Sequence, residues 1–261
     1  MEPSRGTDTI RVSLLSETGP VRRRNEDRCG HRTADATTTL VAVADGVSGY
    51  PAADVASQMA VDIMFDAYDR QRAGVRPDVR LARAAQEANI GIYDRAQVVS
   101  ELRGMATTLT AIAVEGGRLA AVHVGDSRLY LVRDGRALQL TKDHRSGKVN
   151  LTRSVGRELI VAIDRLTRPL DAGDVLVLCT DGLHNVLPDT ELARLAGDAD
   201  PDAACRALVD AALARGADDN LTVAVVHPAG GATARPRAEG LGYRLRHRLR
   251  QRLRGLVGGP R

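Results

Sequence analysis

Acidic side chains stand at the ends of apolar segments at several places along this chain. Asp45 directly follows the run TLVAVA, Asp181 follows VLVLCT, and a glycine comes after each. Four more acids lie at expected strand ends or turns: Glu26, Asp27, Asp126 and Asp219. Carboxylates gathered in one place stay ionised at neutral pH only when cations neutralise them, and all-oxygen ligand sets suit Mg²⁺ or Mn²⁺. If the strands are neighbours, the pattern predicts a divalent-metal site.

A single Asp-Gly pair after a strand is more often an ordinary turn, so the hypothesis depends on the recurrence of the pattern. Glycine after Asp45 and Asp181 lets the backbone approach closely and frees a carbonyl as a further ligand. The histidines show no HxH or HExxH spacing, although His184 is close enough to Asp181 in sequence to lie at the site. The cysteines form no CxxC pair, which favours a reducing compartment over a disulfide framework or a zinc site.

The composition fits a globular protein with an aliphatic core. Of 261 residues, 43% are hydrophobic, but the chain has one Phe, no Trp and five Tyr. These are too few aromatics for the base-stacking surfaces of proteins that bind single-stranded nucleic acid. The first residues, MEPSRGTDT, lack the basic and apolar regions of a signal peptide, and no apolar stretch is long enough to span a membrane. We therefore expect a cytoplasmic protein without a specific nucleic-acid partner.

The elements that must position these acids follow from hydrophobic periodicity. Apolar spacing predicts two long helices in succession, over residues 52–70 and around 81–92, and a third over 201–215. Between residues 106 and 141, short β-rich runs separated by turn signals predict an antiparallel meander. Further strands are expected at 12–16, 40–44, 159–164, 175–179 and 222–226.

Two of these strands constrain the architecture. The runs at 40–44 and 175–179 do not alternate polar with apolar residues, so both faces of each strand must be covered. Two stacked sheets with helices on their outer faces meet that demand. The expected fold class is therefore α+β, a four-layer α-β-β-α sandwich of two antiparallel sheets flanked by helices.

Eight motifs in order carry a resemblance to a known family: RRRNED, ADGVSG, GMATTLTAIAV, VHVGDSRLYLVRDG, LTKDH, LTRSVG, VLVLCTDGL and DDNLTVAVV. The chain resembles the metal-dependent serine/threonine protein phosphatases of type 2C, in their short bacterial form, from about residue 10 to residue 226. That family has the sandwich fold expected above. The resemblance implies hydrolysis of phosphoserine or phosphothreonine by a water that bridges two Mn²⁺ or Mg²⁺ ions.

The resemblance also implies a role for each acid. Asp45 would bridge both ions, the Gly46 carbonyl would bind one of them, and Asp181 and Asp219 would hold the other. Asp126 would share a weaker third ion with Asp181. The implied metal ligands are Asp27, Asp45, Gly46, Asp126, Asp181 and Asp219.

Two further residues of RRRNED are implied at the reaction itself. Arg22 would bind the substrate phosphate, because a guanidinium fork matches phosphate oxygens better than an ammonium group does. Glu26, like Asp27, would act through metal-coordinated water. The catalytic residues implied are thus Arg22 and Glu26.

The chain departs from the family pattern at three places. Val47 and Ser48 stand in DGVSG where the family has Asp-Gly-x-Gly-Gly, and Val47 cannot donate a proton to the leaving group. Only RSGKVN separates LTKDH from LTRSVG, where the family carries a longer flap. Asn185 follows DGLH where relatives commonly have an acid. These changes leave open an alternative, a pseudophosphatase that binds phosphoproteins without turnover.

The domain organisation follows from composition and charge. Residues 1–228 form the expected phosphatase-like domain with a shortened flap, and residues 229–242 are an Ala/Gly/Pro-rich linker. Residues 243–261 are an Arg/Leu-rich basic tail that could dock on anionic membrane or an acidic partner. The expected substrate is a phosphorylated protein, the product of a Ser/Thr kinase.

Overall fold

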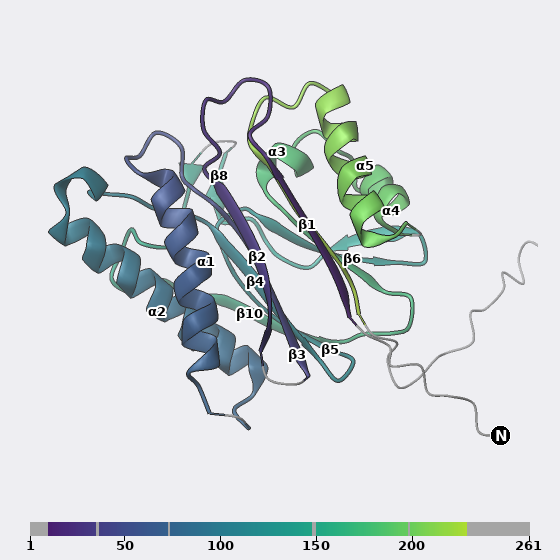
Figure 1. Ribbon diagram of the computed structural model, residues 1–261, viewed down its shortest axis with the longest axis horizontal. Coiled ribbons are helices and arrows are strands. Elements are labelled where there is room, and N and C mark those ends of the chain that lie inside the picture. Colours follow the sequence, from purple (N-terminus) through teal and green to yellow (C-terminus); the bar gives the residue numbers. More distant parts are fainter. Residues whose placement is uncertain (1–9, 35–36, 73, 148–149, 198, 229–261) are drawn as a thin grey trace, which may run out of the picture.

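The computed structural model describes residues 10–34, 37–72, 74–147, 150–197 and 199–228. Within them, two antiparallel five-stranded sheets lie between two pairs of helices (Figure 1). The four-layer sandwich predicted from the sequence is therefore confirmed. The predicted linker and basic tail, residues 229–261, lie outside the described residues. None of the helices in the described part of the chain combines the length and apolar character needed to cross a bilayer.

The first sheet carries the earlier acids of the sequence. Its strand order is β10 (Asp164–Pro169), β5 (Arg118–Val124), β4 (Leu109–Glu115), β3 (Thr38–Asp45) and β2 (Asp27–Ala34). Its outer face is covered by α1 (Ala53–Asp69) and α2 (Pro77–Val98), which pack against each other (Figure 1). These are the two helices predicted from apolar spacing.

The second sheet carries the later acids. Its strand order is β1 (Arg11–Glu17), β12 (Leu221–His227), β11 (Val175–Cys179), β6 (Arg128–Arg133) and β7 (Arg136–Gln139). Two helices cover its outer face: α4 (Asp189–Gly197) and α5 (Pro201–Ala214). The short elements are η1 (Ser100–Leu102), α3 (Asp181–His184) and a ribbon of β8 (Arg145–Ser146) and β9 (Asn150–Leu151).

The two faces of each central strand enter different cores, as the period of two requires. In β3, Leu40 and Ala42 pack against α1 and α2, whereas Val41 and Val43 face the opposite sheet. β11 is buried along its whole length in the same way. Double coverage explains why both runs are apolar without alternation.

The predicted meander is wrong at one connection. β4 pairs with β5 and β6 pairs with β7, but β5 and β6 belong to different sheets, because β5 pairs with β10 and β6 with β11. The chain crosses between the sheets at Gly125, whose φ is 109°. A Cβ there would lie 2.5 Å from the Thr108 Cγ2 atom, so the crossing requires glycine. This crossing places Asp126 between the two sheets.

The strand predicted at residues 159–164 is also misplaced, because β10 begins at Asp164. The apolar run before it lies over α2 instead, where the Asn89 side-chain amide donates to the carbonyl oxygens of Glu158 and Leu159 at 2.9 and 3.0 Å. β10 itself, at the edge of its sheet, is mostly polar and exposed, so its sequence gives little sign of a strand. β2 and α4 were not predicted from the sequence.

We expect Ile92→Ala to destabilise the fold by about 2 to 5 kcal/mol, because Ile92 is completely buried in the core beneath α2. Ile90 on the same helix is 38% exposed, so Ile90→Ala should cost about 0.5 kcal/mol or less. Urea unfolding followed by circular dichroism compares the two. Equal losses in both variants would contradict the packing described for α2.

Candidate active site

The predicted acids meet because strand register brings the relevant strand ends together. β2 and β3 pair with Asp27 opposite Asp45, and the residue before β4, Thr108, donates its backbone N–H to the Asp45 carbonyl oxygen at 2.8 Å. In the other sheet, the end of β11 pairs with the start of β12, so Asp181 and Asp219 come from adjacent connections. All these acids lie at one end of the sandwich.

Five of the carboxylates influence one another's pKa. Burial raises the pKa of Asp45 well above its ordinary value, and four neighbouring carboxylates raise it further: Asp27, Asp181, Asp126 and Asp219. Burial also raises the pKa of Asp181, with Asp219 as the next cause. The structure thus brings together five of the six acids singled out from the sequence.

Asp27 is held deeper than the sequence suggests, since its residue is only 1% exposed. The Thr180 hydroxyl, which follows β11 of the second sheet, donates to Asp27 Oδ2 at 2.8 Å. Burial raises the pKa of Asp27 to about 7, although hydrogen bonds from Thr222 and Thr180 oppose that rise. Asp27 therefore joins the two sheets as well as facing the other carboxylates.

Two glycines allow the close approach of the segments that carry the acids. A Cβ on Gly182 would lie 2.1 Å from the Asn220 carbonyl oxygen and 3.2 Å from the Asp219 Cβ atom. A Cβ on Gly46 would lie 2.3 Å from the Ala53 carbonyl oxygen. Each Asp-Gly pair therefore works as a unit, in which the glycine permits the contact that positions the preceding aspartate.

Asp126 lies in the segment that crosses between the sheets. Burial raises its pKa to about 6, and Asp181 is the next cause. His184 Nε2 donates to the Asp126 carbonyl oxygen at 3.0 Å, and burial lowers the pKa of His184 to about 4. A neutral His184 thus positions the backbone of Asp126, which explains its place beside the site.

Arg22 and Glu26 lie at the rim, joined through Ser48. Arg22 donates to the Ser48 hydroxyl at 3.1 Å and to Asp219 Oδ2 at 2.7 Å. Ser48 in turn donates to Glu26 Oε2 at 2.8 Å. Within the described residues, Ala52 and Asp134 are the non-glycine residues with positive φ, so Ser48 has an ordinary backbone conformation, as its tolerance in DGVSG requires.

Asn220 is a positioning residue that was not predicted from the sequence. Its side-chain amide donates to the carbonyl oxygens of Thr18 and Arg24 at 2.8 and 2.9 Å, and its Oδ1 accepts from the Glu26 N–H at 2.9 Å. It thereby fixes the segment that carries Arg22 and Glu26. Its position directly after Asp219 is the one sequence feature that could have indicated a role at the site.

The donor chemistry of this cluster fits hard divalent cations, which prefer carboxylate and carbonyl oxygens. Among the described residues, no three His, Cys, Asp or Glu side chains already converge tightly enough to hold an ion. Asp219 Oδ2 accepts from Arg22 at 2.7 Å, and the other aspartates repel Asp45, whose pKa they raise. Cations placed among them would replace repulsion with attraction.

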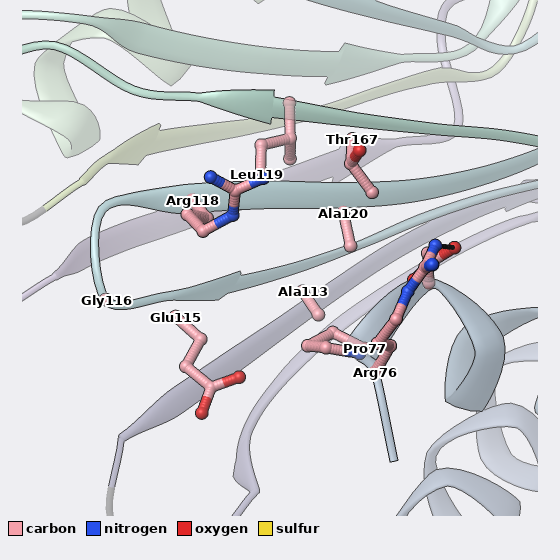
Figure 2. A pocket seen from close by; sticks show the side chains of 10 residues that line it. Arg76, Pro77, Ala113, Glu115, Gly116, Arg118, Leu119, Ala120 and Thr167 are labelled. Carbon is pink, nitrogen blue, oxygen red and sulfur yellow. Dashed lines mark hydrogen bonds and ion pairs between the residues drawn. The ribbon is translucent and has the colours of Figure 1, made fainter. Parts of the chain in front are cut away.

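A cavity of about 650 Å³ lies elsewhere, between the N-terminal end of α2 and the β4–β5 hairpin (Figure 2). Glu115 and Arg118 flank the hairpin turn, whereas Asp126 follows the opposite end of β5. A seven-residue strand spans ~20 Å, so the cavity is separate from the carboxylates.

Comparison with known proteins identifies the family. The family model for Protein phosphatase 2C matches residues 21–224. Serine/threonine phosphatase stp of Listeria welshimeri is 32% identical over 240 residues, which cover 83% of this chain and 95% of that protein. Serine/threonine protein phosphatase PstP of Mycobacterium tuberculosis is 32% identical over 244 residues, which cover 85% of this chain and 46% of that protein.

Solved structures agree with the sequence comparisons. The crystal structure of Mycobacterium tuberculosis PstP gives a TM-score of 0.75 at 32% identity, covering 84% of this chain and 98% of that chain. A structure of the catalytic domain of PstP in complex with two manganese ions gives 0.72 at 32% identity, covering 84% and 97%. With its ordered motifs, its sandwich and its gathered carboxylates, the chain belongs to the protein phosphatase 2C family.

Proposed function

We propose that this chain is a metal-dependent protein phosphatase that hydrolyses phosphoserine and phosphothreonine in phosphorylated proteins. The observation that carries the proposal is the buried set of carboxylates that raise one another's pKa, with Arg22 directly beside it. A module that only binds phosphoproteins has no need of such a repelling cluster. The printed names of the relatives, serine/threonine phosphatases, support the same reaction.

The proposed cofactor is a pair of Mn²⁺ or Mg²⁺ ions, supported by the two manganese ions in the related PstP structure. Asp45, the Gly46 carbonyl, Asp181 and Asp219 would hold them directly, with Asp27 and Glu26 reached through water. When bound, the ions would lower the pKa of water to give a nucleophile and stabilise negative charge on the phosphoryl group. No covalent enzyme intermediate is needed.

The chain's own residues bind and orient the substrate. The Arg22 guanidinium presents paired N–H donors at the rim, which suit two oxygens of a phosphate group. Ser48 and Asp219 hold that guanidinium from two directions. The Thr107 hydroxyl donates to the Asp45 carbonyl oxygen at 2.9 Å, and the Asp45 N–H donates to the Thr108 hydroxyl at the same distance. Both backbone polar groups of Asp45 are thus bonded to the segment before β4. The Val47 side chain has no acidic group, so water would protonate the leaving group.

The purified protein should hydrolyse a phosphothreonine peptide with Mn²⁺ or Mg²⁺ and lose that activity in EDTA, because the nucleophile depends on the ions. Restoring Mn²⁺ should restore the rate. Phosphate release is the measurement, and a catalytic rate that survives complete chelation would refute the metal-dependent mechanism.

The metal-free protein should become less stable as pH rises from about 4 to about 7. The pKa of Asp27 rises from 3.8 to about 7 on folding, so in this range the folded chain binds more protons than the unfolded chain. The stabilisation is complete below the unfolded pKa and is lost as pH rises through the folded pKa. Urea unfolding in EDTA measures the trend.

Two controls test the cause of this pH dependence. Asp27→Asn keeps an oxygen that can accept the Thr180 hydrogen bond but cannot titrate, so it should make the profile less steep. The slope that remains comes from Asp45, Asp126 and Asp181, whose pKa values are also raised in the folded chain. Saturating Mn²⁺ should oppose the loss, because metal binding favours ionised carboxylates. A metal-free wild-type profile that rises over this range would contradict the burial described for Asp27.

Asp181→Asn and Asp219→Asn should each lower kcat by roughly 100-fold or more, since even outer partners of metal ligands contribute 10–100-fold.

Arg22→Ala should mainly raise KM, because it removes a charged donor to the phosphate worth about 1.5–3 kcal/mol. Arg22→Lys is the matched control that keeps the charge without the fork. Steady-state kinetics with circular dichroism separates these effects, and wild-type rates in all variants would overturn the residue assignment.

A further inference from the structure

The shortened flap segment places an arginine at the carboxylate cluster. Arg145 begins β8, and its NH1 atom lies 3.7 Å from Asp126 Oδ2, while its NH2 atom lies 3.4 Å from Asp143 Oδ2. Its side chain is 21% exposed, so the guanidinium is partly screened from water. A cation therefore already lies against an aspartate that the family resemblance assigns to a weaker third ion.

The backbone fixes this arginine relative to Asp126. The His144 N–H donates to the Gly125 carbonyl oxygen at 2.7 Å, and the Thr152 N–H donates to the His144 carbonyl oxygen at 2.8 Å. Arg145 is then paired with Leu151 across the β8–β9 ribbon. His144 is thus hydrogen-bonded to Gly125. Arg145 and Asp126 each follow one of these two bonded residues, so their backbones are held side by side.

The positive charge of Arg145 is available to Asp126 because Asp143 already has a partner. Arg128 binds Asp143 with two parallel hydrogen bonds, Nε to Oδ1 at 2.9 Å and NH2 to Oδ2 at 2.7 Å. Such a bidentate pair matches one carboxylate to one guanidinium. Arg145 accordingly lowers the pKa of Asp126, against the larger effect of burial.

Asp181, the other aspartate of the expected third site, also has non-metal partners. The Asn185 side-chain amide donates to Asp181 Oδ2 at 3.2 Å. Arg145 lowers the pKa of Asp181 as well, although burial and Asp219 raise it more strongly. The family resemblance implies an acid at the position of Asn185, so this rim carries less negative charge than that resemblance implies.

We propose that the Arg145 guanidinium takes the place of the weaker third cation, so that this chain binds two divalent ions only. The inference rests on the proposed two-ion function and replaces the expected third ion with a side chain. Arg145 is then a positioning residue that holds Asp126 and, through Asp126, the segment that crosses between the sheets. This positioning would not depend on the metal concentration, as the binding of a weak third ion would.

Counting bound Mn²⁺ tests the proposal without measuring activity. Titration of the full chain with Mn²⁺ into the millimolar range, followed by electron paramagnetic resonance of the free ion, should give two ions per wild-type chain. Arg145→Ala should bind three, the third more weakly, because Asp126 and Asp181 are then uncompensated. Arg145→Lys keeps the charge and should bind two, as should Arg136→Ala, an exposed control on β7.

The double variant Arg145→Ala with Asp126→Asn should return to two ions, which places the additional ion on Asp126. A wild-type chain that binds three ions, or an Arg145→Ala chain that still binds two, would overturn the inference while leaving the two-ion function standing. A wild-type chain that binds no Mn²⁺ would overturn both. Circular dichroism of each variant shows whether the substitution has disturbed the fold.

Discussion

Repulsion among buried carboxylates is the constraint on which the rest of this structure depends. Asp45 lies within electrostatic reach of four other aspartates, and burial strengthens every one of those interactions. A flexible chain would separate such groups. Here the strand register, the close backbone contact at Gly182 and the Asn220 hydrogen bonds hold the segments in place. The packing of the two sheets keeps the charges together, and the gathered negative charges in turn favour the binding of cations.

Much of this arrangement could be predicted from the sequence because it rests on local patterns. The unbroken apolar runs of β3 and β11 indicate strands covered on both faces, and acids at their ends indicate where the site must lie. The ordered motifs then identify the family that the comparisons confirm. The depth of Asp27 could not be predicted in this way, because Asp27 is buried between the sheets, where it bonds Thr180, 153 residues away in the sequence.

The errors in the sheets share a physical cause, since each concerns which other strand a strand pairs with, and its own residues do not decide that. A run such as β5 pairs equally well, by its own pattern, with the strand before or after it. The Gly125 crossing makes the choice, and the Cβ clash with Thr108 appears only in three dimensions. The polar edge strand β10 is likewise defined by its pairing with β5 rather than by its own residues. Arg145 was also missed, because RSGKVN is informative only once β8 lies beside Asp126.

The hydrogen bond from Thr180 to Asp27 gives the site an uneven tolerance to substitution. Because this bond joins the two sheets, Asp27 serves the interior of the sandwich and the carboxylate cluster at once. Asp219, whose partner Arg22 is partly exposed, lies at the surface end of the same cluster. A mutational scan scored by cellular abundance would therefore separate these two aspartates, whereas a scan scored by enzyme activity alone would group them together.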